Sequence, residues 1–404
     1  MSTPIRPAVA GLPAYALAVQ DVPGVERVIQ LGQNELGVAP SPFAIEAAAR
    51  ATAALNRYPD VEHEGLRRAI AEVHGLRPER ILCGAGSMEL MGLLAMTYCE
   101  PGVEVVVSRF GYKYFELQCA IAGAALRVAP ESLAGVDVGA VLDAVTDRTR
   151  LVYVVNPGNP TGTCLKGGDL ARLRARLPDR VMLLVDTAYA EFVSGGEFET
   201  GFDLVDAGRN VVVLRTFSKA YGLAALRIGW LYAPGEVIDA VARVRPPNTI
   251  TPAGLAAAEA ALRDQAHLDR VVREVTRLRE ALRRHVRALG FEARPSHANF
   301  VLVRFPEDGP MDAGEAFERL KNAGIIVRPT GGYGLADCLR VTIGSAEEIA
   351  AMSSELDQIV ASVPNAPNLP CRRPGPASAT PCRETTQAGA ANVGGAAWVF
   401  KADD

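Results

Sequence analysis

Polar segments follow three apolar runs in the middle of the chain. They read NPGNPTG at 156–162, DTAY at 186–189 and RTFSKAYGL at 215–223. The third contains Lys219, an amine that could form a Schiff base with an aldehyde if apolar and cationic surroundings lowered its pKa. A glycine-rich turn, Gly84–Ser87, precedes a predicted helix, and helix N-termini bind anions. These segments predict a site for a small ligand that carries an aldehyde and an anionic group.

Groups from two of these segments could hold a phosphate beside the amine. Thr216, Ser218 and Arg227 supply two hydroxyls and a forked cation, a donor set that suits phosphate oxygens. Gly86 has no side chain, so the backbone there can approach a ligand closely. Because Thr216 and Ser218 lie just before Lys219 in the chain, the sequence predicts a phosphate cup next to the reactive amine.

Three further residues fit an aromatic ring with a cationic nitrogen and an anionic oxygen. Asp186 would stand at a buried strand end, where a carboxylate is costly unless a cation such as a protonated pyridine nitrogen pairs with it. Asn159 and Tyr189 can donate hydrogen bonds to a phenolate oxygen. Phosphate, aldehyde, pyridinium and phenolate together describe pyridoxal 5'-phosphate. Each signal is weak alone, but their order along the chain favours this cofactor.

The apolar runs that carry these segments are short, rich in β-branched residues and apolar on both faces, which is typical of strands covered by helices on both sides. Helical patterns such as 89–97 and 168–177 alternate with them. This alternation predicts an α/β fold whose large domain has a mostly parallel central sheet flanked by helices, with ligands at the carboxyl ends of the strands. The predicted strands are Ile81–Cys83, Val103–Ser108, Leu151–Val155, Val181–Val185, Val211–Leu214 and Ile228–Leu231.

The rest of the chain predicts a smaller α+β domain and two terminal segments. Residues 41–250 form the predicted large cofactor-binding domain, and residues 251–362 the small one, which begins with a long amphipathic helix. That helix, 268–289, carries seven arginines opposite its apolar stripe, and we expect this basic face to be solvated. Residues 1–40 are an expected N-terminal arm that joins the small domain, and the proline-rich residues 363–404 are an expected disordered tail. Further strands are predicted at 300–303, 325–327 and 339–343.

Composition excludes several classes of partner. The formal net charge is −4, so no strong basic field favours nucleic acid. No apolar run reaches the roughly 18 residues that span a bilayer. The seven cysteines form no CxxC pair and no cluster with histidine, which argues against a zinc site and a disulfide scaffold. We therefore expect a cytoplasmic protein that acts on small molecules, with neither a metal, a nucleic acid nor a membrane as a partner.

The motifs resemble those of the fold-type I, pyridoxal-phosphate-dependent aminotransferases of class I/II, and among them the histidinol-phosphate aminotransferases. The resemblance runs from about Leu12 to Ile359 and is most specific at the lysine motif with its downstream arginine. The matching segments are NRYPD (56–60), CEPG (99–102), NPGNPTGT (156–163), RTFSKAYGLAALRIGW (215–230), VRPP (244–247), ANF (298–300), GIIVRP (324–329) and CLRVTIG (338–344).

The resemblance implies a role for each matching residue. Lys219 would bond to the cofactor and then act as the base that moves a proton to and from the substrate Cα, while Asp186 would keep the pyridine nitrogen protonated. Tyr112 would stack on the ring, and Tyr58 would reach the cofactor phosphate of the neighbouring subunit, so the site would need a homodimer. The phosphate would be held by Gly86, Ser87, Met88, Thr216, Ser218 and Arg227, the 3′-oxygen by Asn159 and Tyr189, and the anionic end of the substrate by Arg328 and Arg340.

The sequence also departs from the family pattern on the substrate side. Val38 stands where a substrate-contacting tyrosine is expected, and Asn248 where a tyrosine follows VRPP. Thr187 and Met88 replace acidic residues. The cofactor set is therefore intact, whereas the substrate set is altered.

These departures keep the amino donor open. The resemblance implies that L-histidinol phosphate gives its amino group to a 2-oxo acid, expected to be 2-oxoglutarate, in histidine biosynthesis. Transamination of aromatic or other amino acids is a first alternative, and a decarboxylase of the same fold is a second, because the cofactor residues do not decide which substrate bond breaks. A ligand sensor attached to a DNA-binding domain is disfavoured, since the aminotransferase pattern begins within the first few dozen residues.

Overall fold

The computed structural model describes residues 3–12, 19, 22–194 and 198–362. The expected tail, 363–404, and part of the expected N-terminal arm lie outside the described residues. Among the described residues, no helix combines the length and the apolar character needed to cross a bilayer.

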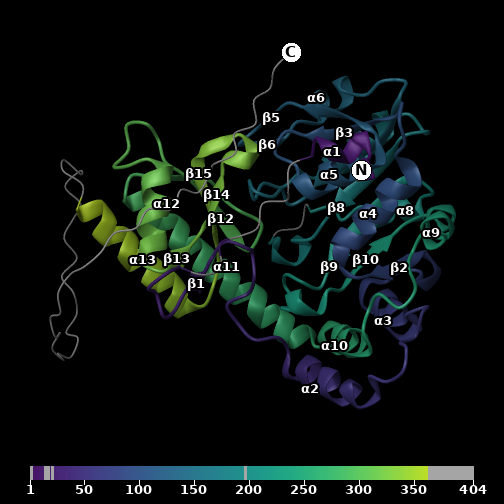
Figure 1. Ribbon diagram of the computed structural model, residues 1–404, viewed down its shortest axis with the longest axis horizontal. Coiled ribbons are helices and arrows are strands. Elements are labelled where there is room, and N and C mark those ends of the chain that lie inside the picture. Colours follow the sequence, from purple (N-terminus) through teal and green to yellow (C-terminus); the bar gives the residue numbers. More distant parts are fainter. Residues whose placement is uncertain (1–2, 13–18, 20–21, 195–197, 363–404) are drawn as a thin grey trace.

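A seven-stranded sheet forms the centre of the larger part of the molecule (Figure 1). Its strand order is β2-β10-β9-β8-β7-β3-β4, and only β10 runs antiparallel to its neighbours. The strands are β2 (Ile81–Gly84), β3 (Glu104–Ser108), β4 (Ala125–Ala129), β7 (Thr149–Val155), β8 (Met182–Asp186), β9 (Val211–Thr216) and β10 (Gly229–Tyr232).

The predicted fold class is confirmed by this mostly parallel sheet and its flanking helices. All six strands that the sequence predicts here are present, within two residues at either end. The strand that the prediction missed is β4, which lies at the edge of the sheet and pairs with β3 alone. Arg127 and Val128 are exposed there, so β4 lacks the continuous apolar pattern of a strand covered on both faces.

Helices cover both faces of the sheet. Alternate residues of each strand point to opposite sides, so each strand contributes apolar side chains to both cores. Val105 and Val107 of β3 pack with the core beneath α4, α5 and α9, whereas Val106 packs with the core on the other face. The helices are α1 (Pro7–Ala10), α2 (Pro42–Ala51), α3 (Glu64–His74), α4 (Gly86–Tyr98), α5 (Lys113–Ala122), α6 (Val138–Asp143), α7 (Asp169–Arg176), α8 (Phe202–Asp206), α9 (Gly235–Ala242), α10 (Pro252–Arg263), α11 (Gln265–Ala288), α12 (Ala313–Asn322) and α13 (Ala346–Ala361).

A four-stranded antiparallel sheet lies on the other side of α11, with α12 and α13 beside it (Figure 1). Its order is β11-β12-β15-β14, and the nearby β1 pairs in parallel with β13. Early residues of the chain thus lie against late ones. The remaining strands are β1 (Ile29–Gln30), β5 (Glu131–Ser132), β6 (Gly135–Val136), β11 (Glu292–Ala293), β12 (Phe300–Arg304), β13 (Ile325–Ile326), β14 (Arg328–Thr330) and β15 (Leu335–Thr342).

The long helix α11 matches its predicted range closely, but its basic face is not wholly solvated. Leu268, Leu278 and Val286 are buried as the apolar stripe predicts. Arg279 is buried as well, and its Nη1 donates to the carbonyl oxygen of Ala298, 2.8 Å away. The expectation for Arg279 is therefore wrong, because the long arginine side chain reaches a backbone acceptor on a neighbouring segment.

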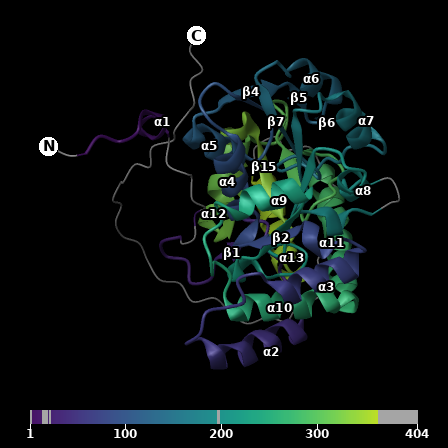
Figure 2. The same cartoon turned by 90° about the vertical axis from the view of Figure 1, so that its right-hand side faces the viewer.

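The helix α2 lies at the outer edge of the molecule, packed on α10 (Figure 2). Its N-cap Ser41 accepts a hydrogen bond from the Phe43 amide and donates to Asp264, the N-cap of α11. Phe43 and Ile45 point outward and are 63% and 53% exposed. This edge of the single chain is therefore unusually apolar.

Candidate functional site

Lys219 lies in the loop after β9, enclosed by backbone from the N-terminal part of the chain. Its Nζ donates to the carbonyl oxygens of Gln33 and Asn34, each 3.1 Å away. Burial, followed by the positive charge of Arg340, lowers the pKa of Lys219 to about 8. A substantial fraction of this amine is therefore neutral near physiological pH, which is the nucleophilic form.

Asp186 is the last residue of β8 and is 3% exposed. Tyr153 donates a hydrogen bond to its Oδ2 at 2.9 Å, and the Ala188 amide donates to its Oδ1 at 3.1 Å. Burial raises the pKa of this carboxyl to about 6, although the two hydrogen bonds and Lys219 oppose the rise. A buried carboxylate with this environment suits a cationic partner.

The predicted phosphate-binding residues converge between β2, β9 and β10. Arg227 Nη1 donates to Ser218 Oγ at 3.3 Å, and the Ser218 amide donates to Thr216 Oγ1 at 3.1 Å. Gly86 has φ +82°, and a Cβ there would stand 2.7 Å from Arg227 Nη2. The glycine therefore leaves room for the guanidinium at the start of α4, where the amides of the first turn have no acceptor within the helix and point toward an anion site. A phosphate group fits this cradle.

Ser87 and Met88 form the first turn of α4 beside this cradle. Tyr112, the N-cap of α5, lies close to them, because its hydroxyl contacts Met88 Sδ at 3.8 Å. The structure therefore brings the predicted ring-stacking tyrosine to the predicted phosphate turn. A methionine sulfur at this position offers a weak acceptor in place of the family's carboxylate.

Asn159 and Tyr189 each accept a side-chain hydrogen bond, and their own donor groups bond to no acceptor in the part of the chain that the structure describes. Arg340 Nη1 donates to Asn159 Oδ1 at 2.6 Å, and Asn34 Nδ2 donates to the Tyr189 hydroxyl oxygen at 2.8 Å. Burial raises the pKa of Tyr189 to about 12, so its hydroxyl stays protonated. The Asn159 amide and the Tyr189 hydroxyl can then both donate to one anionic oxygen.

The two predicted substrate arginines face each other across β14 and β15. Arg328 and Arg340 are register partners in this antiparallel pair, so their side chains share one face. Arg340 is 6% exposed, donates to the Gly32 carbonyl at 2.7 Å and lies over the ring of Phe300. Its buried Nε has no partner among the described residues. Two cations held side by side suit an anionic ligand group.

Tyr58 is not brought together with the other predicted residues. Its side chain is 85% exposed in the single chain. It follows α2 on the same outer edge that exposes Phe43, Ile45 and Leu55. The role predicted for Tyr58 depends on a second subunit.

The departures from the family pattern lie in three different environments. Thr187 is buried and its hydroxyl donates to the Leu214 carbonyl at 2.9 Å, so it ties β8 to β9. Asn248 has φ +61°, a conformation that asparagine adopts more readily than tyrosine. Val38 is 38% exposed and lines a cavity of about 350 Å³ next to Ser218 and Glu35. Of the three, Val38 is placed to change the space offered to a substrate.

Two residues at this site were not singled out from the sequence. Asn34 has φ +57° and holds Tyr189, while its carbonyl accepts from Lys219. Tyr153 lies inside β7 and holds Asp186. One local signal could have indicated Tyr153: it is the only aromatic residue within an otherwise aliphatic strand, LVYVV. No local pattern indicates Asn34, because its partner lies 155 residues away.

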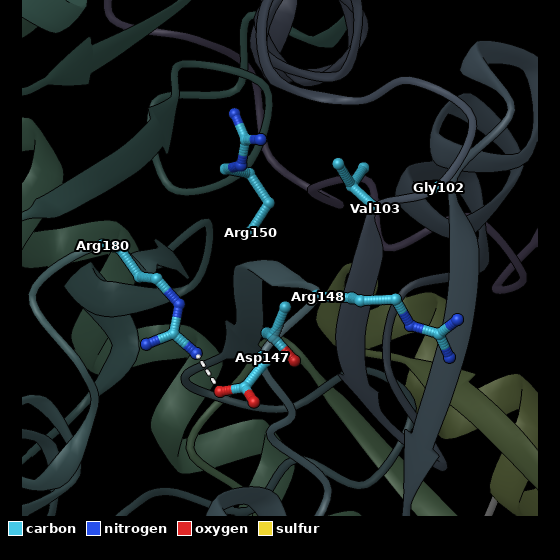
Figure 3. A pocket seen from close by; sticks show the side chains of 7 residues that line it. Gly102, Val103, Asp147, Arg148, Arg150 and Arg180 are labelled. Carbon is cyan, nitrogen blue, oxygen red and sulfur yellow. Dashed lines mark hydrogen bonds and ion pairs between the residues drawn. The ribbon is translucent and has the colours of Figure 1, made fainter.

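A second hollow, of about 440 Å³, lies at the amino ends of β3 and β7, opposite to the predicted site. Figure 3 shows Arg148, Arg150 and Arg180 around it, with Arg180 paired to Asp147. Arg148 pairs with Glu104. This hollow contains none of the predicted site residues. It also lies at the amino ends of the strands, whereas ligands in such sheets bind at the carboxyl ends.

Comparison with known proteins gives the family. The sequence profile described as aminotransferase class I and II matches residues 26–356. A histidinol-phosphate aminotransferase of Dinoroseobacter shibae is 45% identical over 347 residues, which cover 86% of this chain and 95% of the relative. One of Paramagnetospirillum magneticum is 42% identical over 88% of this chain and 98% of its own length.

Solved structures agree with the sequence relatives. The histidinol-phosphate aminotransferase of Sinorhizobium meliloti, solved in complex with pyridoxal-5'-phosphate, superposes with a TM-score of 0.82 at 30% identity. The match covers 90% of this chain and 99% of that one. The chain belongs to the class I and II aminotransferases.

Proposed function

We propose that this enzyme transfers the amino group of L-histidinol phosphate to 2-oxoglutarate, forming imidazole-acetol phosphate and glutamate. Support comes from relatives of that name at 42–45% identity over most of the chain. The single observation that carries the proposal is the convergence of Lys219, Asp186 and the Arg227 cradle with the paired Arg328 and Arg340. The reaction belongs to histidine biosynthesis.

The enzyme depends on pyridoxal 5'-phosphate, which when bound supplies an aldehyde that condenses with amines and a ring that accepts electrons from the substrate Cα. Lys219 Nζ would hold the cofactor and then take the Cα proton, because its lowered pKa leaves a neutral amine. Asp186 would keep a proton on the pyridine nitrogen. Asn159 and Tyr189 would bind the 3′-oxygen, and Ser87, Ser218 and Arg227 would bind the phosphate.

The substrate end of the site is built for an anionic group. Arg340 is held by Asn159 and Gly32, so its guanidinium is oriented before substrate arrives. A 2-oxo acid would pair its carboxylate with this fork. Arg328, the register partner of Arg340, would receive a second anionic group, such as the substrate phosphate. 2-Oxoglutarate carries two carboxylates, one for each arginine, whereas L-histidinol phosphate would place its single anionic group, the phosphate, against the same pair of arginines.

The proposal predicts a rapid half-reaction with one donor. When purified holoenzyme is mixed with L-histidinol phosphate alone, we expect the visible band of the lysine-bound cofactor to disappear as the pyridoxamine form accumulates. Addition of 2-oxoglutarate should restore the band. Stopped-flow absorbance measures both steps, and L-histidine and L-phenylalanine serve as comparison donors.

Other outcomes of this experiment identify a different function. A band that responds only to an aromatic or another amino acid would contradict histidinol phosphate as the donor and indicate that Val38 and Asn248 have changed the specificity. Release of carbon dioxide without the pyridoxamine form would indicate a decarboxylase. Retention of the band with every donor would contradict an aminotransferase.

We further propose a homodimer in which Tyr58 completes the partner's cofactor site. The outer edge around α2 exposes apolar side chains that a second copy would cover, namely Phe43, Ile45, Leu55 and Tyr58. Tyr58 is too exposed to serve its own chain, and its hydroxyl suits a phosphate oxygen.

A mixed dimer tests this arrangement. We expect little activity from Lys219→Ala or, at limiting cofactor, from Tyr58→Ala. When the two variants are unfolded and refolded together, activity should rise to about a quarter of that of the unaltered enzyme. Half of the dimers are then hybrids, and each hybrid has one intact site of two. The single variants, treated alike, are the controls. Activity no higher than that of the separate variants would contradict a shared site.

A further inference from the structure

Tyr153 is fixed by the fold beside the carboxylate that the proposed function assigns to the pyridine nitrogen. It lies on β7, directly next to β8, and is 1% exposed. Its ring packs against Phe115 of α5 with 4.4 Å between ring centroids. Its hydroxyl donates to Asp186 Oδ2 at 2.9 Å. Packing on α5 therefore determines where the hydroxyl stands, independently of any ligand.

The carboxylate of Asp186 is held at both oxygens. Tyr153 donates to Oδ2, and the Ala188 amide donates to Oδ1. Each oxygen keeps a lone pair for a further donor, so the plane of the group is set without blocking it. Both donors stabilise the ionised form, which burial alone would disfavour.

Few other charged or titratable groups face this pair among the described residues. Lys219 after β9 and Tyr189 after β8 interact electrostatically with Asp186. Tyr112 and Glu116 of α5 act on Tyr153. Burial and the neighbouring Asp186 charge raise the pKa of Tyr153 far above its usual value. The Tyr153 hydroxyl therefore keeps its proton, and remains a donor, throughout the neutral pH range.

We propose that Tyr153 is a positioning residue that keeps Asp186 ionised and oriented, so that the site accepts the cofactor with a protonated ring nitrogen. The inference rests on the proposed function, because it concerns how Asp186 meets the pyridine nitrogen. Without the Tyr153 hydroxyl, one hydrogen bond fewer would stabilise the ionised carboxyl of Asp186, which burial disfavours. More of the cofactor-free enzyme would then carry a protonated carboxyl, which must lose its proton before a pyridinium can pair with it.

The test compares cofactor affinity across pH in Tyr153→Phe and the unaltered enzyme. Pyridoxal phosphate is titrated into each cofactor-free protein, and the dissociation constant is taken from the quenching of tryptophan fluorescence. We expect Tyr153→Phe to bind about tenfold more weakly near pH 6 and within about threefold of the unaltered enzyme near pH 8.5. Lys219 also titrates in this range. Because it does so in both proteins, its effect on affinity cancels in the ratio of the two dissociation constants.

Two further variants separate positioning from packing. Tyr232→Phe is the matched control, because Tyr232 is also buried and donates to an aspartate, Asp206, away from the site; its cofactor affinity should not change. In an Asp186→Asn background no carboxylate remains to be kept ionised, so adding Tyr153→Phe should cause no further pH-dependent loss. Thermal melting of each cofactor-free variant establishes that it is folded.

The outcomes discriminate clearly. Affinity unchanged at every pH, or weakened by one factor at every pH, would overturn the inference, as would a full additional loss in the Asp186→Asn background. If the unaltered enzyme failed to bind pyridoxal phosphate at all, the proposed function itself would fail.

Discussion

Replacing Lys219 with alanine is expected to lower turnover by about four orders of magnitude or more and to remove the visible band of the lysine-bound cofactor. The physical reason is that one amine performs two tasks. Lys219 Nζ would hold the cofactor aldehyde, and its partly neutral amine, with a pKa of about 8, would also be the base that takes the Cα proton. Lys219 is the only lysine in the loop that joins β9 to β10.

Steady-state assays and absorbance spectra of the reconstituted variant measure this effect. Lys321→Ala is the control, because Lys321 lies on α12 and pairs with Glu318 far from the site. It should keep full activity and the full band. Activity of Lys219→Ala within tenfold of the unaltered enzyme would contradict the assignment of the cofactor lysine.

Replacing Asp186 with alanine is expected to lower turnover about a thousandfold. Loss of the carboxylate would remove the counter-charge proposed to keep the pyridine nitrogen protonated, so the ring would become a poorer acceptor of electrons from Cα. Because burial raises the pKa of Asp186 to about 6, the ionised form predominates above that pH. Binding of pyridoxal phosphate to the cofactor-free enzyme should therefore weaken as the pH drops through about 6, and Asp186→Ala should lack this decline.

The matched control is Asp206→Ala, which removes a carboxylate that Tyr232 and Arg80 contact outside the site. Its kcat should stay near that of the unaltered enzyme, and its cofactor binding should weaken below about pH 6 in the same way. A loss of turnover of less than tenfold in Asp186→Ala, or an unchanged weakening of cofactor binding at low pH, would count against the assigned role.

Much of this description was accessible from the sequence because the relevant information is local. Strands of the central sheet are short β-branched runs, and they are apolar on both faces because helices cover both sides. The cofactor segments follow such strands directly, as in the loop after β9 and at the end of β8. Since parallel strands bring their carboxyl ends to one edge, segments far apart in the chain were expected to meet there.

The edge strand β4 and the arginine Arg279 show where local pattern fails. β4 pairs with β3 alone, and the exposed Arg127 in the middle of its five residues interrupts the apolar run that marks the inner strands. Arg279 occupies the polar face of an amphipathic helix, yet it is buried and bonds to Ala298. In both cases the environment is set by which segment packs alongside, and that information is not contained in the spacing of neighbouring residues.

The sequence by itself determined the fold class, the candidate cofactor lysine and the identities of the groups that suit pyridoxal phosphate. Only the tertiary structure decided how those groups are held. Asn34 meets Tyr189 and Arg340 meets Asn159 across 155 and 181 residues, and Tyr153 meets Asp186 through the register of β7 and β8. The reason is physical: a residue's type limits what it can donate or accept, whereas its partner depends on strand order, register and packing.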